Sequence, residues 1–202
     1  MNIVCLDVEG VLVPEIWINV AERTGIPELR LTTRDLSDYN ELMRHRLGVL
    51  DEHGLGLTDI QRVIAEMGPL PGAKEFLDGL RRSYQVILLS DTFYEFAMPL
   101  MAQLNYPTLL CHRLELDGDH IVGYRLRQAD SKREAVRAFQ GLNFQVVASG
   151  DSYNDTAMLT QAEAGILFNP PDNVVREFPQ FPVAHDYDQL RSLVDDAGSV
   201  LS

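Results

Sequence analysis

Short apolar runs alternate along this chain with longer segments in which apolar residues recur every three or four positions. The runs at residues 2–6, 85–89, 144–149 and 164–168 predict strands, and the patterns at 73–82, 94–104, 132–139, 173–178 and 188–197 predict helices. Continuous apolar runs are typical of strands buried on both faces of a parallel sheet. Residues 109–127 alternate around Asp117-Gly118-Asp119 and predict a hairpin. We therefore expect an α/β fold with a doubly wound parallel sheet.

The segment from residue 14 to residue 69 breaks this alternation, because it contains helical patterns and no convincing strand. A first helix is expected over residues 14–23, ending at Gly25, and a second over residues 38–50. A third is expected to begin at Thr58, whose side chain suits an N-cap. We predict that residues 14–69 form a small inserted helical cap and that residues 1–13 and 70–202 form the α/β core.

The length and charge of the chain limit the number of domains and the kinds of partner that it can have. A length of 202 residues fits one domain with a small insertion. The net charge of −13 argues against nucleic acid or an anionic membrane as partner, since both require basic surface. Cys5 and Cys111 lie in apolar runs and are expected to be reduced core thiols. With no run of membrane-spanning length and no signal-peptide pattern, we expect a cytoplasmic protein.

Acidic residues follow two of the predicted strands. Asp7 and Glu9 follow the first, and Asp151 and Asp155 follow the strand at residues 144–149. Ligands of parallel sheets bind beyond the carboxyl ends of the strands, so these four side chains should meet. Such a cluster requires a cation, and oxygen-only ligands favour Mg²⁺. The alternative is that the acids only cap a turn and a helix.

This arrangement suits phosphoryl chemistry. A carboxylate at a strand end beside a metal, here Asp7, can attack phosphorus, and Glu9 can act as general acid and then base. The hydroxyl of Ser90 and the backbone N–H groups of Asp91 and Thr92 can hold phosphate oxygens. Lys132 can supply a point charge to the phosphate. Taken singly, each residue is better explained without a function, Ser90 as a helix N-cap and Lys132 as a solvated surface lysine.

The order of these groups along the chain resembles the four motifs of the haloacid dehalogenase superfamily, in its Mg²⁺-dependent phosphatase branch. The resemblance covers essentially the whole chain, including the helical insertion after the first motif. Within the superfamily, the chain is similar to the phosphoserine phosphatases, and more similar still to the variant that also transfers the phosphoryl group to homoserine. The stretches that carry this likeness are residues 6–17, 89–96, 150–155 and 176–182.

The resemblance implies a role for each matching position in the core. Asp7 would be the nucleophile, and Glu9 the acid/base whose backbone carbonyl also binds the metal. Asp151 would bind Mg²⁺ directly, and Asp155 would support the metal site. Ser90 and Lys132 would hold the phosphoryl group, and Asn154 would help to position the phosphate or the loop. Asp91 and Thr92, beside Ser90, are also expected to bind substrate.

The insertion would recognise the rest of the substrate. By the resemblance, Glu15 would hold the substrate ammonium and Arg46 its carboxylate, a group that a guanidinium fork fits well. The alternative is that Glu15 and Arg46 form a salt bridge with each other.

The chain departs from ordinary phosphoserine phosphatases at two places. Glu9 stands where they carry Asp, and Asp91-Thr92 stands where they carry Gly. Both changes agree with the variant that transfers phosphate to homoserine. Two other readings remain open, a phosphatase of another small phosphomonoester such as a sugar phosphate, and a non-catalytic receiver-like phosphoacceptor. The expected partners are thus phosphoserine and homoserine, and a homodimer is a compatible assembly.

Overall fold

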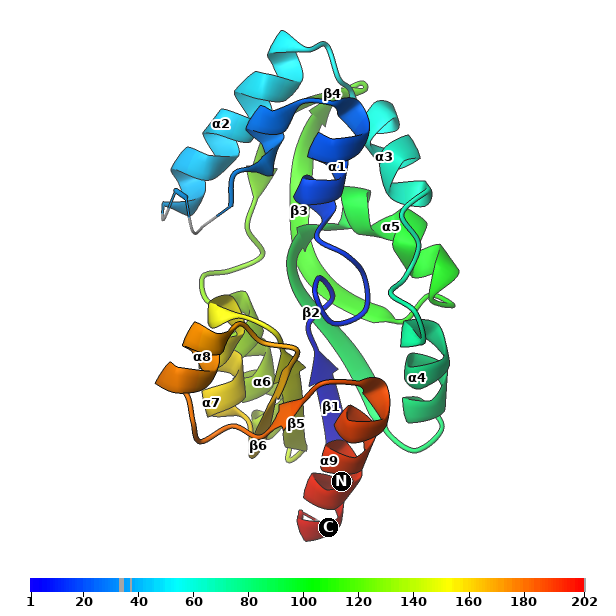
Figure 1. Cartoon of the computed structure of the whole chain (residues 1–202), viewed down its shortest axis with the longest axis vertical. Coiled ribbons are helices and arrows are strands. Elements are labelled where there is room, and N and C mark those ends of the chain that lie inside the picture. The colour runs from blue at the N-terminus through cyan, green and yellow to red at the C-terminus, as the bar shows by residue number, and fades with distance from the viewer. Residues whose placement is uncertain (33–34, 37, 202) are drawn as a thin grey trace.

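The computed structural model describes residues 1–32, 35–36 and 38–201. Within these residues, seven strands form one sheet in the order β4-β3-β2-β1-β5-β6-β7. Their bounds are Asn2–Leu6 (β1), Gln85–Phe93 (β2), Thr108–Asp117 (β3), His120–Arg125 (β4), Gln145–Gly150 (β5), Ala164–Phe168 (β6) and Val183–Ala184 (β7). Neighbouring strands run parallel except β3 and β4, which form the predicted hairpin. The predicted doubly wound parallel sheet is confirmed (Figure 1).

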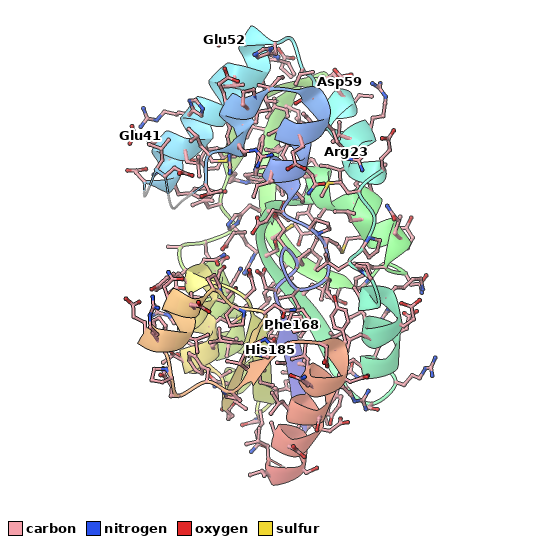
Figure 2. All side chains as sticks on the ribbon, viewed as in Figure 1. Arg23, Glu41, Glu52, Asp59, Phe168 and His185 are labelled. Atoms are coloured by element: carbon pink, nitrogen blue, oxygen red, sulfur yellow. The ribbon has the colours of Figure 1, made fainter. Side chains whose placement is uncertain are left out.

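Helices cover both faces of the sheet because alternate residues of each buried strand point in opposite directions. Val4 and Leu6 of β1 belong to a core formed with helices α4 (Ala73–Leu80), α5 (Tyr94–Gln103) and α9 (Tyr187–Val200). Ile3 and Cys5 face the other way, into a smaller core with α6 (Ser131–Gly141), α7 (Thr156–Gln161) and α8 (Asp172–Glu177). Figure 2 shows side chains filling the space between the sheet and these helices.

The interval between β1 and β2 is helical, as predicted. It contains α1 (Ile16–Thr24), the 3-10 turn η1 (Pro27–Arg30), α2 (Tyr39–Glu52) and α3 (Leu57–Ala65). Gly25 ends α1 with a φ of 72°, and the Asp38 carboxylate caps α2 by accepting the N–H of Glu41. The expected N-cap at Thr58 is wrong, since Gly56 occupies that position. The extent of a separate cap at residues 14–69 stays a prediction.

The β3–β4 hairpin reaches the inserted helices. Asp119 in its turn accepts the N–H of Leu57 through its carbonyl oxygen, at 2.8 Å, and the N–H and hydroxyl of Thr58 through its carboxylate, at 2.9 and 2.6 Å. The rings of Tyr39 on α2 and Tyr124 on β4 meet edge to face, 5.8 Å apart. Thr58, the second residue of α3, therefore links this helix to the hairpin.

The remaining differences from the sequence predictions are local. Strand β2 continues to Phe93, so Ser90 lies inside the strand and not at its end. Strand β7 has only two residues, too few to give a pattern. Cys5 and Cys111 are buried free thiols. Among the described helices, none is both long and apolar enough to span a membrane.

Candidate active site

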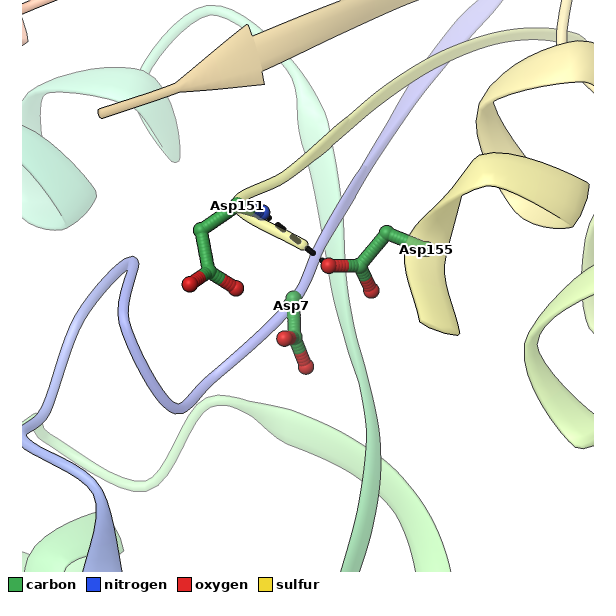
Figure 3. Close-up of side chains that lie close together, drawn as sticks. All are labelled: Asp7, Asp151 and Asp155. Carbon is green, nitrogen blue, oxygen red and sulfur yellow. Dashed lines mark hydrogen bonds between the residues drawn. The ribbon is translucent and has the colours of Figure 1, made fainter. Parts of the chain in front are cut away.

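The carboxylates that follow β1 and β5 lie together (Figure 3). The two strands are hydrogen-bonded neighbours, with Leu6 paired to Ser149, so their carboxyl ends open at the same edge of the sheet. Asp7, Asp151 and Asp155 each offer one oxygen atom within 4.8 Å of the others. Asp7 and Asp155 are buried, and Asp151 is partly exposed. This is a compact, oxygen-only cluster of the kind that binds Mg²⁺.

Two glycines make the close approach of these acids sterically feasible. Gly10 has a φ of 76°, and a Cβ atom there would lie 2.5 Å from Oδ2 of Asp151. A Cβ atom on Gly150 would lie 2.2 Å from the carboxyl carbon of Asp155. No side chain fits at either position without displacing an acid of the cluster.

Lys132 is the cation nearest to the acidic cluster among the described ion pairs. It stands in the first turn of α6, and 3% of it is exposed. Its Nζ lies 2.8 Å from Oδ1 of Asp155, 2.9 Å from Oδ1 of Asp7 and 3.5 Å from Oδ2 of Asp91. The other oxygen of Asp155 accepts the backbone N–H groups of Asp151 and Ser152. Both oxygens of Asp155 are thus engaged, which suits a supporting role beside a metal.

The site carries more negative charge than Lys132 can balance. Burial, together with Asp155, raises the pKa of Asp7 well above its usual value and that of Asp151 to about 7. Burial opposes the charge on Lys132, but Asp155 and Asp7 together hold its pKa well above the ordinary lysine value. A divalent cation would relieve this excess, so the residues present fit Mg²⁺, with Asp7 and Asp151 as its carboxylate ligands.

Glu9 joins the site to the first inserted helix. Its Oε2 accepts the N–H of Ile16 at the start of α1, at 2.8 Å. Burial, followed by the nearby charge of Glu15, raises the pKa of Glu9 to about 7. A carboxyl group with such a pKa can both donate and accept a proton near neutral pH.

The β2 end of the site is formed by the predicted phosphate-binding segment. Ser90 and Thr92 are buried, and Oγ of Ser90 accepts the N–H of Thr92 at 3.2 Å. The carboxylate of Asp91 faces Lys132 and accepts the side-chain N–H of Asn154 at 3.3 Å. Burial disfavours its charge, but Lys132 and the surrounding donors hold the pKa of Asp91 well below its usual range. Substrate contacts by these residues stay predictions.

Arg46 is a buried residue of α2 and is not part of the acidic cluster of Asp7, Asp151 and Asp155. It is 7% exposed, its guanidinium carbon lies 4.5 Å from the centre of the Trp17 ring, and one terminal nitrogen donates to the carbonyl of Leu31 at 2.8 Å. Its Nε is buried and has no hydrogen-bond partner among the residues that the structure describes. Among the ion pairs between described residues, none joins Glu15 to Arg46, so the mutual salt bridge is not what the structure shows. Within the described residues, the Nε of Arg46 is therefore a buried donor that no protein acceptor satisfies.

Sequence reasoning missed three residues beside this site. A cavity of about 330 Å³ next to Lys132 is lined in part by Tyr39, His112 and Ser131. Ser131 donates its hydroxyl to Oδ1 of Asp91 at 3.2 Å, and the Tyr39 hydroxyl lies 3.5 Å from the Asp91 carbonyl oxygen. The position of Ser131 beside Lys132 was the only sequence signal for any of them. His112 and Tyr39 reach the site only through the fold.

Comparison with known proteins places this arrangement in a family. The sequence-family model of the haloacid dehalogenase-like hydrolases matches residues 18–160 of this chain. Phosphoserine phosphatase ThrH of Pseudomonas aeruginosa is 63% identical over 192 residues, which cover 95% of this chain and 94% of that protein. A phosphoserine phosphatase of Pseudomonas syringae pv. tomato is 62% identical, over 95% of this chain and 81% of its own length.

Solved structures agree with the sequence comparison. A phosphoserine phosphatase from T. onnurineus, crystallised with NDSB-201, superposes with a TM-score of 0.71 at 27% identity, covering 97% of this chain and 94% of that one. An apo-form phosphoserine phosphatase has a TM-score of 0.76 at 19% identity, over 96% and 98% of the two chains, and this likeness concerns the fold alone. With the family model matching most of its length, the chain belongs to the haloacid dehalogenase-like hydrolases.

Proposed function

We propose that this protein is a Mg²⁺-dependent phosphoserine phosphatase that acts through an aspartyl-phosphate on Asp7 and can also transfer the phosphoryl group to homoserine. The observation that carries the proposal is the carboxylate of Asp7, buried at the end of β1 against Lys132 and beside Asp151. The phosphoserine phosphatases that are 63% and 62% identical over 95% of the chain support the substrate class.

Magnesium would be held by the carboxylates of Asp7 and Asp151, with the backbone carbonyl of Glu9 as a further ligand. When bound, it would neutralise the charge of the acids and of the phosphoryl oxygens. Asp155 would remain in the supporting position that its bonds to Lys132 and the Asp151 backbone define.

The covalent steps follow from the placement of two carboxyl groups. An Asp7 oxygen attacks phosphorus, forming an acyl–phosphate bond while the bond from phosphorus to the serine oxygen breaks. Glu9, protonated at the outset, gives its proton to the departing serine oxygen. Ionised Glu9 then takes a proton from the incoming water or alcohol, whose oxygen bonds to phosphorus and releases Asp7. Lys132 and Ser90 would hold the phosphoryl oxygens during both steps.

Arg46 and Glu15 would select the amino-acid end of the substrate. The buried Arg46 on α2 has an Nε with no partner among the described residues, and a carboxylate can accept from a guanidinium in bidentate geometry. Glu15 is exposed at the start of α1, and its charge acts on both Glu9 and Arg46. An ammonium group held there would lie beside the acid/base.

Transfer to homoserine follows from competition for the aspartyl-phosphate. Homoserine has the ammonium and carboxylate of serine and one more methylene before its hydroxyl. If Arg46 and Glu15 hold it where serine has just left, its hydroxyl has a large effective concentration compared with a loosely held water. Glu9 and Asp91-Thr92, at which the chain departs from ordinary phosphoserine phosphatases, motivate this part of the proposal.

One experiment tests the whole proposal. Phosphoserine is supplied with Mg²⁺, with and without excess homoserine, while free phosphate and phosphohomoserine are both quantified; a sugar phosphate is the control substrate. We expect rapid turnover of phosphoserine, and phosphohomoserine that increases as free phosphate falls. A preference for the sugar phosphate would refute the substrate class. Free phosphate as the sole phosphorus product at saturating homoserine would refute transfer.

A further inference from the structure

A buried histidine, His112, lines the same cavity as Lys132 and lies near Asp91. His112 lies on β3 and is 3% exposed. It pairs with Phe93 of β2 in the sheet register, two residues beyond Asp91. Its Nδ1 accepts the backbone N–H of Arg127 at 3.1 Å. Since an accepting nitrogen carries no proton, the geometry requires the proton of the neutral ring to be on Nε2.

That Nε2–H points at Asp91. It lies 3.6 Å from Oδ1 of Asp91, which also accepts the hydroxyl of Ser131 at 3.2 Å. A separation of 3.6 Å is long for a hydrogen bond, but bonds at catalytic sites commonly tighten when the ligand binds. Ser131 thus donates to Oδ1 of Asp91 and Nε2 of His112 faces the same oxygen, while Lys132 and Asn154 face Oδ2, at 3.5 and 3.3 Å.

The three carboxylates around Lys132 are not equivalent. Asp155 and Asp7 lie at hydrogen-bond distance from its Nζ, 2.8 and 2.9 Å, whereas Asp91 stands off at 3.5 Å. An ammonium group has three protons, and two are taken by the near carboxylates. The third remains for a phosphoryl oxygen only as long as Asp91 does not close on Lys132.

We propose that His112 is a positioning residue that holds Asp91 back from Lys132, so that the lysine keeps one N–H for the phosphoryl oxygen. The inference rests on the proposed function, because it assumes that a phosphoryl group binds at Lys132. Its physical reason is that a carboxylate released from its donors moves toward the nearest cation. Asp91 would then compete with phosphate for the same ammonium group.

Two amide substitutions at His112 test its two hydrogen-bonding nitrogens one at a time. The side-chain oxygen of Asn can take the place of Nδ1, and the amide nitrogen of Gln can take the place of Nε2. His112→Asn therefore keeps the acceptor for Arg127 and removes the donor to Asp91, whereas His112→Gln keeps the donor. Because the loss falls on a donor to a charged group, we expect His112→Asn to weaken binding of inorganic phosphate about fivefold or more. His112→Gln should stay within about twofold of wild type.

The readout is the dissociation constant of inorganic phosphate, measured by calorimetry on the intact protein in Mg²⁺, with Tm recorded for each variant. The same pair of substitutions is repeated on Asp91→Asn, which carries no charge to compete for Lys132. In that background, replacing His112 should change phosphate affinity less than about twofold. Equal losses in the two amide variants, unchanged affinity in His112→Asn, or an undiminished effect with Asp91→Asn would each overturn the proposal.

A further test uses the wild-type protein and therefore does not depend on whether a variant folds. A nitrogen-15 spectrum of the imidazole should show a proton on Nε2 of His112. The neutral Nδ1–H tautomer, which has no donor toward Asp91, would overturn the proposal. Failure of the proposed function is a separate result. It would appear as a wild-type protein that hydrolyses no phosphomonoester, whatever the phosphate affinities of the variants.

Discussion

Replacing Arg46 tests how the protein recognises its substrate. Arg46 is 7% exposed, and its guanidinium contacts the Trp17 ring and the Leu31 carbonyl, while its Nε has no hydrogen-bond partner in the described part of the chain. Such a group is pre-oriented, so little freedom is lost when a carboxylate binds. Arg46→Ala should therefore weaken binding of phosphoserine and leave the phosphoryl chemistry at Asp7 intact.

The size of the effect follows from the burial of the contact. A hydrogen bond to a charged group contributes about 1.5–3 kcal/mol, and each 1.4 kcal/mol corresponds to a factor of ten. Loss of this contact should raise KM for phosphoserine roughly tenfold to a hundredfold. The change belongs in KM more than in kcat, because the carboxylate is held equally before and during phosphoryl transfer.

The assay compares phosphoserine with an aryl phosphate, which has no carboxylate. KM for the aryl phosphate should change less than about threefold in Arg46→Ala. Arg44→Ala is the matched control, since Arg44 lies on the same helix, α2, and is exposed. Arg46→Lys should fall between wild type and alanine, because it keeps the charge and loses the fork. Equal losses on both substrates would show that Arg46 is structural and refute the assignment.

Other predictions concern the acidic cluster. Asp7→Asn preserves shape and removes the nucleophile, so turnover should fall below about 1% of wild type, and higher residual activity would refute covalent catalysis by Asp7. Chelation should abolish phosphoserine hydrolysis and added Mg²⁺ should restore it; activity of the fully chelated protein would show that the metal site is misassigned. Gly150→Ala should lower kcat at least about tenfold, because its Cβ would lie 2.2 Å from the carboxyl carbon of Asp155. Gly141→Ala is its control, having no atom within 4 Å of the added Cβ, and equal kcat in both variants would contradict the steric argument.

The acidic cluster at the end of the sheet was predictable because it depends on short local sequence patterns. An apolar run followed by acids places a carboxylate at a strand end, and two such runs in a parallel sheet bring Asp7 and Asp151 to one edge. The helices of the insertion were predictable for a similar reason, since Gly25 and Asp38 end and begin them by local capping. What local patterns do not contain is the contact of Asp119 with Thr58, because it joins residues 61 positions apart.

The same limit explains why the surroundings of Asp91 could not be predicted from its neighbours in sequence. Beside Ser90, the Asp91 segment reads as a phosphate-binding loop, yet β2 continues to Phe93 and carries the Asp91 side chain between His112 and Lys132. A carboxylate beside a phosphate site would repel the ligand if it were free. In the proposal made for His112, neighbouring donors hold this carboxylate, so that one N–H of Lys132 remains for the phosphate. The pairing of Phe93 with His112 creates this arrangement, and that pairing depends on the register between β2 and β3, which neither strand encodes alone.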